Sequence, residues 1–391
     1  MSTSANLAGG PEEPIEPTPG RAVMQEVTTG TDWRSTLLIP FLAVVTAFII
    51  GGIIIMLTGV PFSQVLEAYW ALIKGSVFSI KATSETLTAA TPLILTGLSV
   101  ALAFRAGLFN IGAEGQMLIG GMTALAVGFS FTGLPWFIHL PLALIAGIIG
   151  GAAWGFIPGF LRARTGAHEV ITTIMLNYVA ILLVQFLLQV SFFQREGRND
   201  PVSKTVEETA KLPQLLEFIN PSLRVNAGLI VAILAAAFVN WLLFRTTIGF
   251  EFRAVGANPA AARYAGMSVT KVYVLVMIIA GALAGLAGTG QVLGVLGRAT
   301  PGFSASLGFD GIAVALLGRS NPWGVVAAAI LFGGLRAGGQ EMQVSAGVGI
   351  DLIGVMQALI IIFVAAPGLI TALYRLKTTA SSTQISKGWA S

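Results

Sequence analysis

The residues with the clearest chemistry in this chain are Asn110, Glu114 and Gln116, a carboxyl group and two amides inside the apolar, glycine-rich segment 107–130. An ionisable side chain within an apolar segment is costly and usually faces a bundle interior or a water-filled path. The spacing of Asn110 and Glu114 predicts that both lie on one face of a helix. They either line a translocation route for a hydroxylated solute or clamp neighbouring backbone at a helix break.

Catalytic patterns find no support in this sequence. It contains no cysteine and only two histidines, His139 and His168, which are far apart. The sequence contains neither the serine-hydrolase elbow nor the zinc-protease helix motif. It also lacks the nucleotide-binding loop, because Gly294-Val-Leu-Gly-Arg298 is not followed by Lys-Ser/Thr. We therefore expect no catalytic residue, no metal site and no cofactor bound by this chain. If the chain moves a solute uphill, we expect the energy to come from outside the chain.

A second informative stretch, 249–266, is a polar island between two apolar segments. Asn258 followed by Pro259 predicts a helix start, because Asn caps a free backbone N–H and Pro suits the first helical position. Three alanines then favour helix, and Gly266 can take the left-handed conformation that ends it. Upstream, residues 251–255 predict another turn that ends at Gly256.

A simple connecting loop does not need such preorganisation, so we expect 249–266 to be a docking element that receives force from a partner protein.

Composition predicts that membrane-spanning helices position these groups. Of 391 residues, 55% are hydrophobic and 10% are charged, and the apolar runs repeatedly reach the roughly 20 residues that cross a bilayer. We expect an all-α polytopic membrane protein with about ten transmembrane helices, some short or broken. The expected spans are 37–57, 87–104, 107–130, 134–160, 170–193, 227–244, 271–291, 304–318, 323–339 and 350–374.

Three of these spans, 107–130, 304–318 and 323–339, are either full crossings or half-helices. Asp310, in the second of them, is either an acid at a helix N-terminus or a pore residue. Residues 59–86 are mixed in polarity and are placed outside the membrane or at its interface. A possible inverted repeat pairs Leu134-Pro-Trp with Asn321-Pro-Trp, although coincidence explains this echo as well.

The chain divides into a disordered N-terminal tail (1–34), a membrane domain (35–374) and a C-terminal tail (375–391). Lys and Arg favour cytoplasmic loops, and this bias places both termini and the segment 249–266 in the cytoplasm. The polar segment 194–225, with balanced charges, is expected on the extracellular side. The basic residues behind the net charge of +4 are scattered among short loops, so we expect no nucleic-acid partner.

Two phrases carry a resemblance to a known family. Arg253-Ala-Val-Gly-Ala-Asn-Pro-Ala-Ala-Ala-Arg-Tyr-Ala-Gly266 resembles the cytoplasmic coupling motif, Glu-Ala-Ala-three residues-Gly, of bacterial ATP-binding-cassette (ABC) importer permeases, although Ala260 replaces the Glu. Gly107-Leu-Phe-Asn-Ile-Gly-Ala-Glu-Gly-Gln116 is similar to nucleoside permeases in the ribose and simple-sugar branch. The resemblance covers roughly residues 35–370. It implies that Ala261, Ala262 and Gly266 form the tight docking face of the coupling element. The coupling residues that it implies are Glu251, Arg253, Gly256, Asn258, Pro259, Ala261, Ala262, Arg263, Tyr264 and Gly266.

The resemblance implies a multi-pass permease subunit of the bacterial cell membrane that takes up nucleosides by alternating access. Its partners would be two ABC ATPases that bind ATP and Mg²⁺, a second and different permease chain, and an extracytoplasmic substrate-binding lipoprotein. The nearest rival function is the same machine carrying ribose or another simple sugar. Two rival classes of protein are a secondary transporter driven by an ion gradient and a scaffold or intramembrane enzyme.

Overall fold

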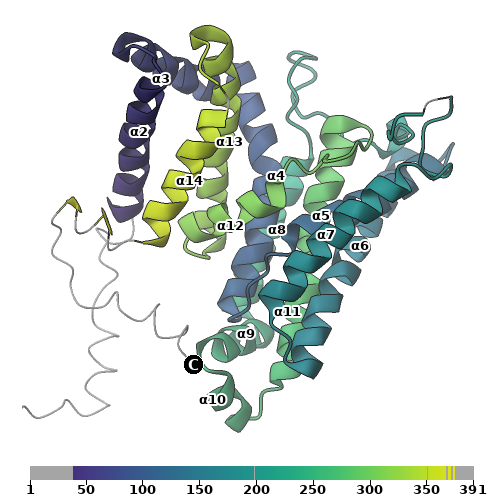
Figure 1. Cartoon of the computed structure of the whole chain (residues 1–391). Helices are drawn as coiled ribbons and strands as arrows, with labels where there is room; N and C mark the ends of the chain where they lie inside the picture. Colours follow the sequence, from purple (N-terminus) through teal and green to yellow (C-terminus); the bar gives the residue numbers. More distant parts are fainter. Residues whose placement is uncertain (1–37, 198, 350, 367–368, 371–372, 375–391) are drawn as a thin grey trace, which may run out of the picture.

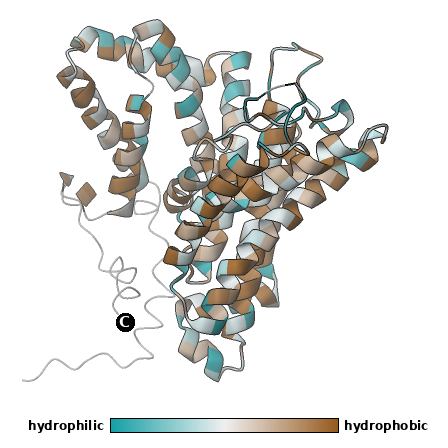
Figure 2. Ribbon diagram, turned by 45° about the vertical axis from the view of Figure 1, so that its right-hand side comes forward, coloured by the Kyte–Doolittle hydropathy of each residue, from teal (hydrophilic) through white to brown (hydrophobic). Residues whose placement is uncertain are grey.

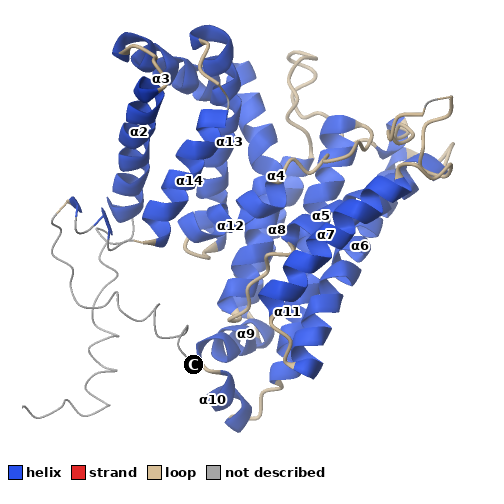
Figure 3. Cartoon of the chain, viewed as in Figure 1, coloured by secondary structure: helices blue, strands red, loops and turns tan. Residues whose placement is uncertain are grey.

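The computed structural model describes residues 38–374 except 198, 350, 367–368 and 371–372. The predicted tails, 1–34 and 375–391, lie outside the described residues. Figure 1 shows the chain as a bundle of helices, Figure 2 shows that hydrophobic residues predominate along many of them, and Figure 3 shows that loops join them. The prediction of an all-α polytopic membrane protein is confirmed.

The helices differ widely in length. In chain order they are α2 (Ile39–Leu57), α3 (Phe62–Val77), α4 (Ile80–Arg105), α5 (Ala113–Ser130), α6 (Trp136–Thr165), α7 (Glu169–Leu187), η2 (Glu208–Ala210), α8 (Gly228–Arg245), α9 (Thr247–Ala257), α10 (Pro259–Tyr264), α11 (Val269–Gly290), η3 (Gln291–Leu296), α12 (Leu307–Leu317), α13 (Pro322–Ala346) and α14 (Asp351–Ala365).

Six of these helices, α2, α4, α6, α7, α8 and α11, are long and apolar enough to cross a bilayer. The other four predicted spans coincide with α5, α12, α13 and α14. Helix α12 has 11 residues, so its length of about 16 Å is too short for a crossing. The predicted count of ten crossings is therefore not confirmed, whereas the half-helix interpretation holds for α12.

The segment 59–86 is more ordered than its mixed polarity predicts. Helix α3 buries Val65, Ala68 and Leu72 and packs against α13 and α4. Helix α4 begins at Ile80 rather than at the predicted residue 87. Its first turns tolerate polar residues because these are bonded within the protein; the Thr86 hydroxyl, for example, donates to the Ser76 carbonyl at 2.7 Å.

Helix α4 lies at the centre of the bundle and contacts α3, α8, α11, α12 and α13. Helices α5, α6, α7 and α11 pack together beside it, and α2 pairs with α14 (Figure 1). Because so many elements meet on α4, the positions of both predicted sites depend on it: the coupling segment lies at its C-terminal end, and the polar group lies beside its last turns.

Glycines bring α6 and α11 into backbone contact. A Cβ at Gly281 would overlap the Gly151 carbonyl, and a Cβ at Gly285 would overlap the Gly147 carbonyl. Along the interface Gly159 meets Met277 while Gly147 meets residues near the end of α11, so the two helices run antiparallel. Small residues at a membrane helix interface permit such an approach.

The two halves of the bundle pack in the same pattern. Helix α4 contacts α13 as α11 contacts α6, and α4 contacts α12 as α11 contacts α5. Helices α6 and α13 begin at the two Pro-Trp sequences. Helix α6 runs antiparallel to α11, and α13 runs antiparallel to α4. Since α11 begins at the end of the bundle where α4 ends, α6 and α13 point in opposite directions. This is the arrangement that an inverted repeat predicts.

The two ends of the bundle are different. We call the end with α9 and α10 the coupling side and the end with residues 188–227 the loop side. The loop is folded onto the helix ends: the Glu207 amide donates to the Gly128 carbonyl and the Val206 amide to the Gly297 carbonyl, both at 2.9 Å. Val206 and Leu212 are buried there, so this polar segment is a compact cap.

Candidate functional site

The predicted coupling segment, 249–266, lies in two short helices, α9 and α10, and we keep the name coupling segment for this pair of helices. The Asn258 side chain accepts a hydrogen bond from the Ala261 amide at 3.0 Å, and Pro259 occupies the first turn. Gly266 has a φ of +87°, and the Gly266 and Met267 amides donate to the Arg263 and Ala262 carbonyls. This pair of bonds is a Schellman motif. The predicted start and end of this helix are confirmed.

Two details of the coupling segment differ from the prediction. Gly256 lies inside α9, which continues to Ala257, and does not end a turn. A Cβ at Gly256 would overlap the Arg105 carbonyl, and Gly107 lies across from the same glycine. Gly256 is therefore required by the close approach of α9 to the end of α4, not by a left-handed stop.

Ala262 is the other difference. It is buried in the core of its own chain, so it anchors α10 rather than facing a partner. The exposed surface of the segment comes instead from Ala261, Arg263 and Gly266, together with Tyr264, whose side chain is 95% exposed. Five of the six residues of α10 are exposed and Ala262 is the buried one, so most of this helix faces outward.

A chain of contacts joins α9 to the rest of the coupling side. The Arg253 guanidinium lies 5.4 Å from the centre of the Phe244 ring, and the Arg105 guanidinium lies 5.7 Å from the same ring. Arg105 Nε in turn donates to the Ser320 carbonyl at 2.9 Å, in the turn between α12 and α13. Movement of α9 would thus be felt by α4, α8, α12 and α13. Glu251 is half-buried on the same helix.

The predicted polar group divides into two parts. Asn110 and Gln116 are buried and form a reciprocal amide pair, with Asn110 Nδ2 donating to Gln116 Oε1 at 2.9 Å and Gln116 Nε2 donating to Asn110 Oδ1 at 3.1 Å. Asn110 Nδ2 also donates to the Ser99 hydroxyl of α4 at 3.1 Å. The pair ties the turn before α5 to both neighbouring helices.

Glu114 belongs to the second part, where the half-helix α12 begins. Its buried carboxylate accepts a bond from the Ser304 hydroxyl and a 2.8 Å bond from the Gly308 amide. Thr96 of α4 donates to the Leu307 carbonyl at 3.1 Å beside it. The carboxylate thus satisfies a free N–H at the start of α12, as expected near the positive end of a helix dipole.

The prediction that Asn110 and Glu114 share a helix face is wrong, because Asn110 precedes α5, which begins at Ala113. The two side chains bond to different partners. Asn177 of α7 completes this region: its Oδ1 accepts from the Gly115 amide and its Nδ2 donates to the Ile111 carbonyl, both at 2.9 Å. These contacts have the geometry of the clamp, and the role of the group at a translocation route stays a prediction.

An ion pair that the sequence did not reveal lies beside this group. Arg336 of α13 donates to the carboxylate of Asp310 in α12 and to the Ala305 carbonyl at 3.3 Å. Charges of opposite sign in two neighbouring apolar segments were the available signal, but their pairing depends on how α12 and α13 fold together. Asp310 therefore does more than compensate a helix dipole.

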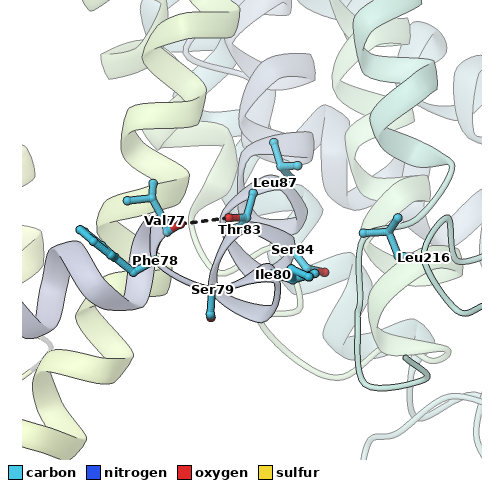
Figure 4. A pocket seen from close by; sticks show the side chains of 8 residues that line it. All are labelled: Val77, Phe78, Ser79, Ile80, Thr83, Ser84, Leu87 and Leu216. Atoms are coloured by element: carbon cyan, nitrogen blue, oxygen red, sulfur yellow. Dashed lines mark hydrogen bonds between the residues drawn. The ribbon is translucent and has the colours of Figure 1, made fainter. Parts of the chain in front are cut away.

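The loop side contains a shallow hollow of about 340 Å³, shown in Figure 4. The turn between α3 and α4 lines it, with Val77, Ile80 and Leu87, and Leu216 of the loop faces them. The Thr83 hydroxyl donates to the Val77 carbonyl at 3.4 Å across the turn. The hollow is mainly apolar, and none of the predicted site residues lines it.

Comparison with known proteins agrees with the resemblance to ABC importer permeases that residues 107–116 and 253–266 indicate. Residues 82–365 match the family model described as branched-chain amino acid transport system / permease component. The chain is 43% identical to the guanosine ABC transporter permease protein NupP of Bacillus subtilis, over 85% of this chain and 94% of that protein.

Two further relatives cover most of the chain. The nucleoside ABC transporter permease protein NupB of Lactococcus lactis is 38% identical over 86% of this chain and 93% of its own length. The glucose ABC transporter permease protein TsgB13 of Haloferax volcanii is also 38% identical, over 83% and 86%. No solved structure matched the chain.

Proposed function

Because the chain belongs to the family of branched-chain amino acid transport system / permease components, we propose that it is the membrane-spanning subunit of an ABC importer for nucleosides. The two relatives of this chain that are named as guanosine and nucleoside permeases support this substrate class. The relatives are transporter permeases by name, and in this proposal the chain catalyses no reaction.

The observation that carries the proposal is the coupling segment. Helices α9 and α10 form a capped element with an exposed outer surface, and contacts through Phe244 and Arg105 join it to the membrane helices. A separate ATPase that moved α9 would also move the ends of α4 and α8. This is what alternating access driven by a partner requires.

The distribution of basic residues supports a cytoplasmic position for the coupling side, with both termini on the same side of the membrane. Cytoplasmic ends of membrane helices are enriched in Lys and Arg. Basic residues gather at this end of the bundle, in the last turns of α4, α6, α8 and α10 and in the first turn of α11: Arg105, Arg162, Arg164, Arg245, Arg263 and Lys271.

The proposed complex contains two ABC ATPases, which bind ATP and Mg²⁺, a second and different permease chain, and an extracytoplasmic substrate-binding lipoprotein. Within it, Asn110, Glu114 and Gln116 lie near the route without being open to it. They would hold the start of α5 and the start of α12 in place, so they would shape the wall of the route.

Reconstitution of the whole complex in lipid vesicles tests the proposal. We expect ATP-dependent uptake of labelled guanosine or uridine, and no uptake when the ATPase subunits are omitted. Uptake that continues without any ATPase would contradict the proposal and support a secondary transporter driven by an ion gradient.

The second candidate substrate is a simple sugar, and the similarity of this chain to the glucose permease TsgB13 supports it. Ribose and nucleosides share hydroxyl groups, so competition separates them. We expect excess nucleoside to abolish labelled-nucleoside uptake and excess ribose to leave it unchanged. Uptake of ribose that is insensitive to nucleoside would instead assign the chain to sugar transport.

A further inference from the structure

The Asp310–Arg336 ion pair lies deep within the membrane domain. Thr96, which bonds to the start of α12, is about 14 Å from the end of α4 at 1.5 Å per residue. Arg336 is about 21 Å from the start of α13 and about 15 Å from its end, by the same rise. Both estimates place the pair near the middle of the bilayer rather than at its surface.

The pair is only partly covered. The side chains of Arg336 and Asp310 keep 30% and 25% of their surface exposed, and Phe309, the preceding residue of α12, is 41% exposed. A charged pair facing hydrocarbon at this depth would be expensive, so such residues usually face a water-filled cavity or a substrate path. Helix α12 also begins here, after Ala305 and Ser306 in the left-handed conformation.

We propose that Asp310, Arg336 and Phe309 form a nucleoside-contact site at the start of α12, on the face that closes the route with the second permease. The inference rests on the proposed function, since it names the groups that would recognise that substrate. The site is distinct from the Asn110–Gln116 pair, whose hydrogen bonds are made within the protein.

The chemistry of the three groups matches two parts of a nucleoside. The carboxylate can accept hydrogen bonds from neighbouring ribose hydroxyls and the guanidinium beside it can donate to them, and hydrogen bonds to charged groups are the stronger ones. An exposed aromatic ring offers a stacking surface that accepts any base. A site built to bond hydroxyls rejects analogues without them, because its polar groups are then left unpaired.

The supporting elements suit a site that must respond to ATP hydrolysis. Helices α12 and α13 carry the pair, and the turn between them accepts the hydrogen bond from Arg105 at 2.9 Å. Arg105 shares the Phe244 ring with Arg253 of α9. The contacts therefore connect the coupling segment to the two helices that hold Asp310 and Arg336.

Uptake by the reconstituted complex, divided by its rate of ATP hydrolysis, tests the site. Asp310→Asn is expected to lower uptake of uridine about tenfold or more relative to the natural chain. Uptake of 2′,3′-dideoxyuridine, which lacks the neighbouring 2′- and 3′-hydroxyls, is expected to change by less than about twofold. Comparing each substrate with the natural chain cancels the selectivity of the binding lipoprotein, which is the same in both.

Two matched controls exist in this chain. Glu85 pairs with Arg224 at 3.4 Å, and the exposed fraction of its side chain, 24%, is close to the 25% of Asp310. This control pair, however, lies on the loop side. Phe156 of α6 has the same 41% exposure as Phe309. We expect Glu85→Gln and Phe156→Leu to leave both uptakes unchanged, whereas Phe309→Leu lowers uridine uptake about fivefold or more, as loss of a stacking surface would.

The outcomes are separable. If the natural complex takes up no nucleoside, the proposed function fails. If it takes up nucleosides but Asp310→Asn lowers both substrates equally, or neither, the contact site is wrong and the pair is structural. If Asp310→Asn does not assemble, Phe309→Leu decides, and a result like that of Phe156→Leu or a second failure to assemble overturns the site.

Discussion

At the scale of single residues, the buried polar groups near the start of α5 make their hydrogen bonds within the protein. Asn110 and Gln116 satisfy each other, and Glu114 satisfies an amide at the start of α12. In a low-dielectric interior, a polar group left without a partner costs more than the bond itself contributes. The arrangement is therefore sensitive to the loss of one partner and tolerant of the loss of both.

Removal of one amide tests this asymmetry. Gln116→Leu leaves Asn110 partly unpaired and is expected to destabilise the protein by about 1–2 kcal/mol, measured as thermal unfolding in detergent. The double variant Asn110→Leu/Gln116→Leu should lie closer to the natural protein. If Gln116→Leu unfolds like the natural protein yet loses uptake, the amide contacts substrate and does not serve as a clamp.

At the scale of elements, glycines decide how closely the helices approach. Gly285 of α11 packs on the backbone of α6, whereas Gly290, at the end of the same helix, faces open space. The same residue type therefore has two different roles on one helix. Only the first position requires the absence of a side chain.

These two glycines make a matched pair for substitution. A Cβ at Gly285 would overlap the Gly147 carbonyl, so Gly285→Ala is expected to destabilise the protein by about 1–3 kcal/mol through overpacking. Gly290→Ala should be neutral or stabilising by up to about 1 kcal/mol, because alanine is the better helix former. Equal unfolding temperatures for the two variants would show that α6 and α11 are not in backbone contact.

At the scale of the whole molecule, the coupling segment and the ion pair lie on elements that share contacts. Helix α9 touches α4 through Gly256 and approaches α8 through Arg253, and α4 bonds to the turn that joins α12 to α13. A membrane domain built this way can convert movement at one end into movement at mid-membrane. The exposed turn after α10 is the place where that movement would enter.

Gly266→Glu tests that entry point. Gly266 has a φ of +87° and open space around it, so Glu adds about 1–2 kcal/mol of backbone strain and a charge on the exposed surface. We expect normal membrane insertion with nucleoside uptake reduced about tenfold or more, while ATP hydrolysis by the complex continues.

Gly347→Glu is its control, because Gly347 also has a left-handed φ, of +66°, and open space, but it follows α13 on the loop side. Strain and charge are thus alike in the two variants, and the position differs. Equal loss of uptake in both would show that strain alone explains the effect and that the turn after α10 does not dock a partner.

Much of the architecture could be predicted because it depends on local physical chemistry. Apolar runs reveal membrane helices whatever surrounds them, and Asn258, Pro259 and Gly266 define α10 through bonds within a few residues of each other. Segment 59–86 was harder to interpret, because its polar residues are satisfied by partners in other helices, as Thr86 is by Ser76.

The sequence by itself therefore determined the fold class, the capped helix α10 and the presence of buried polar residues at 110–116. Only the tertiary structure decided that Gly256 accommodates the end of α4, that Ala262 faces inward and that Asn110 lies outside its expected helix. It also brought Asp310 to Arg336. The physical reason is that each of these facts depends on contacts between helices, and those contacts follow from how the helices pack.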